Sequence, residues 1–347
     1  MPIEKSVSFR SQLVSNSLDL ISEAGLVCGR TPKLIAGIVS QLAAYTEEGV
    51  PMTPTVFICN SISALVQISG VGGEFVPLIS TAAPLNEKTG TALLKAAAPL
   101  CKDNWRIYVE RSSDEINCTY GVFCGSTDPS TLTIDEVVLS DETADFPIIR
   151  ITQNAINKVE VRTNVGGQIE FRFNDDEDTN ELNNKKKILD LAECIAADVD
   201  IQNEKFKNFV ERLLISSIKN SHGTLIAVVE GNTLPEALRD VIPVTPHIDL
   251  LDRFRLHIDE GRTAISVGRL QVAVELASGF ICSDGITIFN TSGCILGYRA
   301  FIQNNGGSAS AGGARSRAYE AMLDLVGADL KAAFFRSQDG RTELRQV

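Results

Sequence analysis

The chain has 347 residues, 44% of them hydrophobic and 22% charged, a composition typical of a folded globular protein with room for two domains. Its formal net charge of -12 excludes a general basic surface for a nucleic-acid backbone, although a local basic pocket could still hold a nucleotide. The eight cysteines include no C-x-x-C pair and there are only three histidines, which argues against a structural zinc site.

The N-terminal residues lack the apolar core of a signal peptide, and no apolar run approaches the roughly 20 residues of a membrane span. Scattered cysteines in a chain of this length are typical of buried thiols in a reducing compartment. We therefore expect a cytoplasmic protein that neither crosses a membrane nor binds nucleic acid.

The first half of the chain predicts a mixed α/β domain with a large sheet component. Apolar residues at three- and four-residue spacing indicate helices over residues 13–21 and 32–45. Glycines 70, 72 and 73 are interpreted as a turn, because no strand–loop–helix context surrounds them. Strands are expected at 55–59, 107–110, 116–123 and 148–151, and a hairpin over 159–173 around Gly166 and Gly167.

Residues 174–187 form the clearest boundary, because this polar and highly charged stretch cannot bury a face. A linker or a long exposed loop is expected there. Its acidic core lacks the spacing of a calcium loop and the closing glutamate. We therefore predict an N-terminal domain over residues 1–180 and a second domain over residues 188–347.

The second half alternates helices and strands, which predicts an α/β domain with a mixed central sheet flanked by helices. Residues 188–218 are strongly helical, and 223–230 form a short buried strand of the kind found in parallel sheets. A helix is expected over 269–279. Strands are expected over 280–289 and 294–302, joined by a tight turn, and further strands over 332–336 and 342–345.

Residues 308–322 combine a Gly/Ala/Ser run with the start of a helix that carries Arg315 and Arg317, and that buries Tyr319, Met322, Leu323 and Val326. Glycine lets a backbone approach a ligand closely, and the free N–H groups of a helix start favour phosphate. Arginine adds forked donors that match phosphate oxygens. This pattern predicts a polyphosphate cradle, with an exposed helix face as the alternative.

Asp284 and Gly285 interrupt an otherwise apolar run about thirty residues earlier. An aspartate there is unfavourable unless it binds something, and the glycine exposes backbone beside it. A bulge or a turn at a strand end is the competing interpretation.

In this order the motifs resemble those of the diadenylate cyclase domain family. The family's short opening strand, Asp-Gly-Ala strand, Gly-Cys hairpin and Arg-His-Arg loop-helix have counterparts at Gly223 to Ile226, Ser283 to Ile286, Gly293 to Leu296 and Gly313 to Tyr319. The closing hairpin is matched by residues 335–344. The resemblance covers residues 190–347, and the position of the N-terminal half resembles that of the sensor-like regulatory domains found before divergent cyclase domains.

The resemblance implies a nucleotidyltransferase that joins two ATP molecules into cyclic di-AMP, with Mg²⁺ or Mn²⁺ as cofactor. It assigns the metal to Asp284 and a catalytic role to Asp284, Arg315 and Arg317. It places nucleotide contacts at Gly285, Leu296, Gly312, Gly313 and Ser316, with Leu296 near an adenine. Because each family site holds one ATP, it also implies a homodimer or a larger homo-oligomer.

The motifs depart from the family at three positions beside these residues. Ile286 replaces an alanine, Ala314 a threonine, and Ser316 the histidine between the arginines. Serine donates a hydrogen bond but carries no positive charge. A second hypothesis is therefore a degenerate cyclase fold that senses ATP or a cyclic dinucleotide without turnover, and a third is a purely structural or protein-interaction role.

Overall fold

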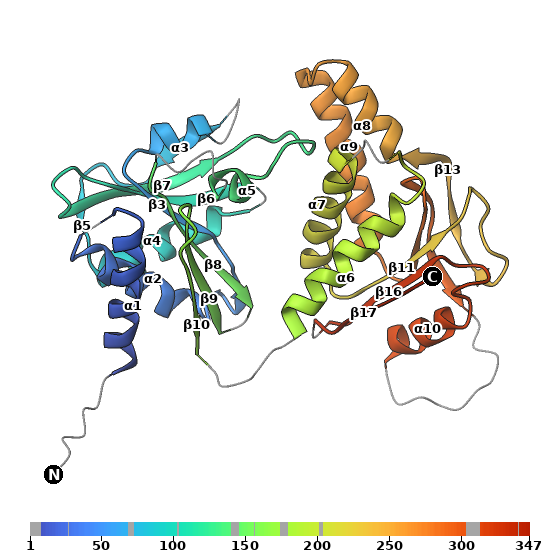
Figure 1. Ribbon diagram of the computed structural model, residues 1–347, viewed down its shortest axis with the longest axis horizontal. Coiled ribbons are helices and arrows are strands. Elements are labelled where there is room, and N and C mark those ends of the chain that lie inside the picture. The colour runs from blue at the N-terminus through green and yellow to red at the C-terminus, as the bar shows by residue number, and fades with distance from the viewer. Residues whose placement is uncertain are drawn as a thin grey trace, which may run out of the picture. The chain divides into compact units, whose positions relative to one another are not determined.

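The computed structural model describes residues 8–26, 28–68, 73–102, 104–139, 146–155, 157–173, 180–200, 204–302, 313–338 and 340–347. The chain divides into two compact units, which are described separately (Figure 1). The N-terminal unit comprises Met1–Thr127 and Leu132–Asp176. The C-terminal unit comprises Asp128–Thr131 and Glu177–Val347.

The N-terminal unit is built on one mixed sheet with the strand order β10-β9-β8-β3-β6-β7-β4, and β5 also pairs with β7. Strands β3 and β6 run parallel, whereas the neighbouring pairs are antiparallel. Its elements are α1 (Phe9–Glu23), α2 (Thr31–Leu42), β1 (Thr46–Glu47), β2 (Val50–Pro51), β3 (Val56–Cys59), α3 (Ile62–Ile68), β4 (Glu74–Pro77), β5 (Ala83–Pro84), α4 (Glu87–Ala97), the 3₁₀ turn Ala98–Leu100, β6 (Trp105–Arg111), β7 (Asn117–Cys124), α5 (Ile134–Val138), β8 (Ile149–Ala155), β9 (Lys158–Thr163) and β10 (Gln168–Arg172).

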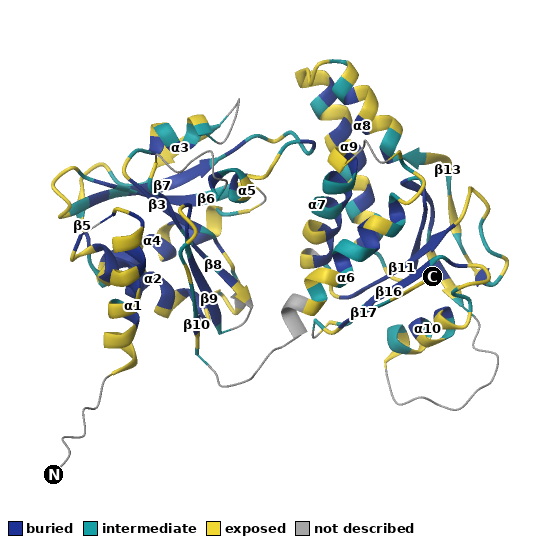
Figure 2. Ribbon diagram, viewed as in Figure 1, coloured by how far each residue is buried: buried dark blue, intermediate teal, exposed yellow. Residues whose placement is uncertain are grey.

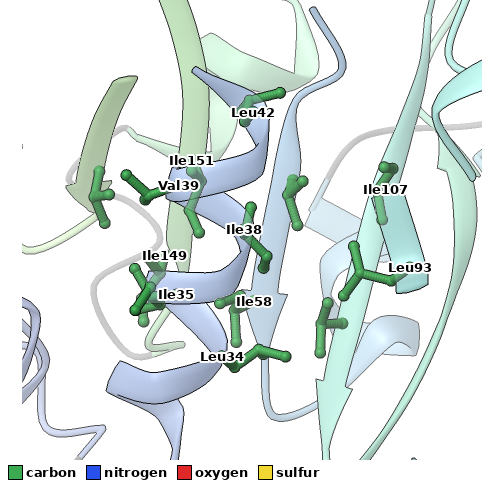
Figure 3. Packing of buried hydrophobic residues seen from close by; sticks show 14 of the residues in the cluster. Leu34, Ile35, Ile38, Val39, Leu42, Ile58, Leu93, Ile107, Ile149 and Ile151 are labelled. Atoms are coloured by element: carbon green, nitrogen blue, oxygen red, sulfur yellow. The ribbon is translucent and has the colours of Figure 1, made fainter. Parts of the chain in front are cut away.

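The alternation of side chains along β3 separates two hydrophobic clusters. Val56 and Ile58 point into the cluster formed with α1, α2 and α4, whereas Phe57 and Cys59 point into the cluster formed with α3 and α5. In Figure 3 the side chains of α2 pack against Ile58 and against strands on either side of it. The unit is therefore a sheet covered by helices on both faces, as the sequence predicts for an α/β domain.

Helices α2 and α4 touch at two glycines. A Cβ atom built on Gly37 would lie 2.5 Å from the backbone oxygen of Glu87, and one built on Gly90 would lie 2.7 Å from that of Leu34. Real side chains do not fit at such distances, so the two backbones approach this closely only because neither residue has a side chain. The contact sets the position of α4 over the sheet.

Gly90→Ala tests this contact. Helix propensity alone would stabilise the variant by about 1 kcal/mol, but the added methyl group must separate two packed backbones, which costs about 1–3 kcal/mol. We therefore expect a lower melting temperature by calorimetry. Thr91→Ala, at an exposed position of the same helix, is the matched control and should not lower it. A Gly90→Ala protein as stable as this control would contradict the proposed contact.

The C-terminal unit also contains one mixed sheet, with the strand order β12-β15-β14-β11-β16-β17 and with β13 paired to β15. Strands β11 and β14 are parallel, and β11 and β16 are antiparallel. The elements are α6 (Asn180–Ile195), α7 (Glu204–Asn220), β11 (Thr224–Val229), β12 (Leu238–Arg239), β13 (Ile242–Asp249), α8 (Leu250–Asp259), α9 (Ala264–Cys282), β14 (Ile286–Asn290), β15 (Cys294–Ile302), α10 (Ala314–Leu323), β16 (Ala332–Arg336) and β17 (Thr342–Gln346).

Every residue of β11 is buried, and the strand again divides two cores. Ile226 and Val228 join the cluster with helices α6 to α9, whereas Leu225, Ala227 and Val229 join the cluster with α10. Figure 1 shows α10 on the side of the sheet opposite α6 and α7. The predicted mixed sheet flanked by helices is confirmed for this unit.

A buried histidine ties the segment Asp128–Thr131 to the rest of the C-terminal unit. The Nε2 atom of His257 lies 3.0 Å from Oδ1 of Asp128 and 3.1 Å from Oγ of Ser130, and its Nδ1 lies 2.8 Å from Oγ of Ser266. His257 is 1% exposed, so these partners satisfy a polar ring that water does not reach. No pattern in the sequence marks this segment as part of the second unit.

Several predicted elements are confirmed, among them the hairpin of β9 and β10, the tight turn between β14 and β15, and the closing hairpin of β16 and β17. The turn at Gly293 is held by the buried Asn290, whose Oδ1 accepts hydrogen bonds from the backbone N–H groups of Ser292 and Cys294 at 3.0 and 2.7 Å. The predicted turn at glycines 70 and 72 lies outside the described residues.

Other predictions are wrong. The predicted linker over 174–187 is helical from Asn180 onward, where it forms the start of α6, and residues 174–179 lie outside the described ranges. The predicted helical run 188–218 is two helices, α6 and α7, separated after Ile195. Leu323, expected to be buried by α10, is 36% exposed.

All eight cysteines are free thiols. Burial raises the pKa of Cys59 and of Cys101 to about 12, so both are neutral under ordinary conditions. They pack as small apolar side chains, as the sequence predicts for scattered cysteines.

Among the described helices, α9 is long and apolar enough to cross a membrane by length and composition, although the sequence analysis expects no such segment. One face of α9 is part of the hydrophobic core, through Leu270, Ala273, Ala277 and Ile281. The core of a folded domain accounts for these residues.

A carboxylate on β17 makes the C-terminal unit sensitive to acid. Burial alone would raise the pKa of Glu343, but hydrogen bonds from Lys187 Nζ at 3.2 Å and Arg341 Nε at 3.3 Å outweigh it and lower the pKa below its ordinary value of 4.5. A carboxylate whose pKa is lower in the folded chain than in the unfolded chain stabilises the fold at pH values above its ordinary pKa. This stabilisation is lost as the pH falls through the lower pKa of the folded protein.

Glu343→Gln removes this charge. We expect the melting temperature of the natural protein to exceed that of the variant at neutral pH, and the gap to shrink as the pH is lowered below 4.5. Calorimetric melts over an acidic pH series measure the gap. A gap of constant size at every pH would show that the carboxylate has the same pKa in the folded and unfolded chains.

Candidate functional site

Three segments far apart in the sequence meet at one end of the C-terminal sheet. His222 and Gly223 precede the first residue of β11, and Asp284 and Gly285 precede the first residue of β14. Because β11 and β14 are parallel neighbours, their amino ends lie at the same edge of the sheet. The third segment is the first turn of α10, which brings Arg315 to this edge.

The guanidinium of Arg315 joins the three segments. Its Nη1 donates a hydrogen bond to the backbone oxygen of His222 at 3.1 Å, and its Nη2 lies 3.5 Å from Oδ1 of Asp284. The pair is open to solvent, with side-chain exposures of 35% for Arg315 and 72% for Asp284. The sequence motifs predict that both residues belong to one site, and the structure brings the two side chains into contact.

Asp284 lies in the turn between α9 and β14. The predicted strand over 280–289 is therefore wrong in its first part, because α9 continues to Cys282 and the strand begins only at Ile286. The hydroxyl groups of Ser283 and Thr287 both donate to the backbone oxygen of Phe280, at 2.7 and 2.8 Å, and so satisfy a carbonyl at the end of the helix.

Gly285 makes this turn possible. Its φ of +90° is a conformation that residues with side chains rarely adopt, and a Cβ atom there would lie 2.9 Å from Cα of Arg299. Arg299 lies at an irregularity of β15, where the register with β14 shifts between Ile286 and Ile288. The backbone of β15 therefore packs directly against Gly285.

Arg299 is a residue that the sequence analysis missed. It is exposed and has a φ of +54°, which is uncommon for an arginine. No sequence pattern distinguishes an arginine within an apolar strand from one on an ordinary solvent-facing position. Only the register shift places this cationic residue beside Gly285.

The remaining predicted phosphate contacts lie at the start of α10. Gly313 is the N-cap, and its backbone oxygen accepts a hydrogen bond from Arg317 N at 3.2 Å. The side chain of Arg317 is exposed and that of Ser316 is half-buried. Gly312 lies outside the described residues, as does the Gly/Ala/Ser run before it. The helix start thus presents Arg315 and backbone N–H groups at the same edge as Asp284, whereas Arg317, two positions along the helix, faces another side of it.

Leu296 and Ile286 are both fully buried in the cluster beneath α10. Tyr319 of α10 lies over the same cluster and stacks on Phe335 with ring centroids 5.4 Å apart. The larger side chain at position 286 is thus accommodated by the core and does not project into the exposed site. A contact between Leu296 and an adenine stays a prediction, since in this structure the side chain is a core residue.

The described residues contain no group of three or more His, Cys, Asp or Glu side chains that could hold a metal ion. Asp284 is the carboxylate that the contact with Arg315 brings to this site. Magnesium is commonly held by one or two carboxylates together with the phosphates of its substrate, whereas a metal site made of protein alone needs more ligands. The donor set of this site fits a cation that arrives with a nucleotide.

Comparison of the chain with protein-family models, with curated proteins and with solved structures finds no match in any of the three. The likeness to the diadenylate cyclase domain therefore depends only on the motifs of the sequence.

Two glycine substitutions test how tightly the site is built. Gly285→Ala places a side chain at a positive φ and against the backbone of β15, and we expect a loss of about 1–3 kcal/mol in the free energy of unfolding. Gly313→Ala is the matched control, because a Cβ there meets nothing within 4 Å, and it should cost less than about 1 kcal/mol. Denaturant unfolding measures both variants. Equal effects would show that the turn is not constrained at Gly285.

Proposed function

We propose that the C-terminal unit binds ATP at the edge formed by Asp284, Arg315 and the start of α10, and that two such units join two ATP molecules into cyclic di-AMP. The observation that carries the proposal is the contact between Arg315 and Asp284, 31 residues apart in the sequence and 3.5 Å apart in space. This contact places an acidic and a basic group, both open to solvent, beside a helix N-terminus, and that combination suits a metal-bound polyphosphate.

In this reaction the 3′-hydroxyl of one ATP attacks the α-phosphate of the other, the bond to pyrophosphate breaks, and the hydroxyl proton is released. Two such attacks close the ring and release two pyrophosphates. Mg²⁺ or Mn²⁺ held by Asp284 and the phosphates would supply charge neutralisation. Arg315 and Arg317 would bind phosphate oxygens, and the N–H groups at the start of α10 would orient them.

The solvent exposure of the two charged residues supports the proposed ligand site. Asp284 and Arg315 are the exposed members of the group, whereas Ile286 and Leu296 are enclosed beneath them. A nucleotide phosphate would therefore meet charged atoms without displacing core side chains. The net charge of -12 makes such a local cationic position necessary for binding ATP. We further propose a cytoplasmic homo-oligomer in which the N-terminal unit regulates the site.

A second function, binding without turnover, is favoured by two observations. Ser316 occupies the position between the arginines where the resembled family has histidine, and Asp284 is a single, exposed carboxylate. Binding needs charge near the phosphates, but turnover needs the reacting atoms aligned, and a displacement of about 1 Å can cost a hundredfold in rate. A sensor of ATP or a cyclic dinucleotide is therefore the alternative function.

Incubation of the full chain with ATP and Mn²⁺ or Mg²⁺, followed by mass spectrometry, tests the cyclase. We expect a cyclic dinucleotide, with its rate reduced at least about a hundredfold in Arg315→Ala because a donor to the phosphates is removed. Arg253→Ala removes an exposed arginine from α8 and is the matched control for the change in net charge. It should retain the full rate.

Titration calorimetry with ATP and with cyclic di-AMP separates the two functions. Binding that Arg315→Ala abolishes, without any product, would establish the sensor and exclude the cyclase. The absence of both product and binding would exclude both functions and leave a structural role.

A further inference from the structure

Helix α9 is apolar on two faces. Leu270, Ala277 and their neighbours face the core, but Ile265, Val272 and Leu276 are 69%, 64% and 47% exposed. Residues seven and four positions apart lie on one side of a helix, so these three form a continuous outer stripe. In Figure 2, α9 carries both buried and exposed colours along its length. The proposed site does not use this stripe.

Two glycines, Gly268 and Gly279, lie on the same stripe. Glycine destabilises a helix interior relative to alanine, so its presence calls for a reason. A Cβ atom on either residue would meet nothing within 4 Å, and no described contact within the chain requires them. In α2 and α4, by contrast, the backbone of the partner helix occupies the space where a Cβ atom of Gly37 or Gly90 would lie. Bare backbone on an outer face suits the close approach of a helix from another molecule.

The five residues of the stripe are symmetric in their spacing. Ile265, Gly268, Val272, Leu276 and Gly279 follow one another at intervals of three, four, four and three. An antiparallel copy centred on Val272 runs through the same positions in the opposite order. Ile265 then lies opposite Gly279, and Leu276 lies opposite Gly268. An antiparallel copy of the same helix would therefore place a large side chain against bare backbone at four of the five positions, and Val272 against its own counterpart at the centre. Such self-complementarity is what a two-fold contact requires.

The charged residues beside the stripe are held within their own chain. Arg269 Nη1 donates to Glu260 Oε1 at 3.0 Å, and Gln271 Nε2 donates to Glu275 Oε1 at 3.1 Å. Glu260 and Glu275 thus each have a hydrogen-bond donor within their own chain, and Glu260 is also paired with a charge. A lipid surface is a poorer occupant, because helices that lie on membranes carry an excess of Lys and Arg on their polar face, whereas this stripe is flanked by both signs. The inner face of α9 is also part of the core.

We propose that α9 forms an antiparallel two-fold contact with α9 of a second copy of this chain, centred on Val272. The contact is independent of the proposed cyclase activity, since none of its five residues belongs to the candidate site. It would join two C-terminal units along the helices that lead into Asp284.

Analytical ultracentrifugation of the full chain without nucleotide tests the contact. We expect a species of twice the 37.5 kDa chain mass. Val272→Glu should weaken the dimer at least about a hundredfold, because two like charges would meet at the axis. Ile116→Glu, at a position 42% exposed in the N-terminal unit, is the matched control and should leave the dimer intact. Circular dichroism melts check that both variants fold.

Cross-linking tests the register. In a Cys282→Ser background, which removes the exposed cysteine, a mixture of Ile265→Cys and Gly279→Cys proteins should form a disulfide between unlike chains on oxidation, and Val272→Cys should form one with itself. A parallel contact would instead link Ile265→Cys with its own kind.

Three results would overturn the proposal: a monomer throughout the micromolar range, a dimer that survives Val272→Glu, or binding to anionic phospholipid vesicles that Val272→Glu abolishes. Because these experiments contain no nucleotide, they do not test a dimer that forms only around ATP, as the cyclase requires, and a failure to make product would not bear on the α9 contact.

Discussion

The parallel pairing of β11 with β14 is the constraint on which the C-terminal unit depends. Parallel neighbours cannot be joined by a short turn, so the chain must leave β11, cross the sheet and return to the same edge before β14 begins. Helix α9 makes this return and ends at Cys282. The parallel pairing therefore places Asp284 at the edge of the sheet where β11 also begins. The candidate site lies at this edge because α9 brings the chain back to it.

The hydrophobic periodicity of the sequence predicts those helices and strands whose apolar residues are also the buried ones in the structure. The fully buried β11 and the hairpin of β9 and β10 are of this kind. Residues 280–282 were wrongly assigned to a strand and belong to α9, because a short apolar run looks alike in a buried strand and at the end of a helix. Strand β13 was missed because most of its residues are exposed or half-buried and show no alternation. Chain-distant contacts such as Asp128 with His257 leave no local pattern.

The candidate site was predicted from residue types that are unusual in their local sequence context. An aspartate among apolar residues and two arginines at a helix start are visible in the sequence, and Asp284 and Arg315 do meet. What the sequence could not supply is the direction of side chains. Ile286 replaces the family's alanine beside the predicted nucleotide contacts, but the side chain points into the core with Leu296. Arg299 was overlooked because only a register shift in β15 brings it to Gly285.

The solvent exposure of the Arg315–Asp284 ion pair has a consequence for any ligand. Ion pairs in water contribute only about 0–1 kcal/mol, whereas a buried charge left without its partner is costly. With 35% and 72% of the two side chains exposed, the pair can separate at little cost when a cation takes Asp284 or an anion takes Arg315. The two residues thus hold each other in position in the absence of a ligand, and a ligand that replaces either partner also removes the contact between the first turn of α10 and the turn before β14.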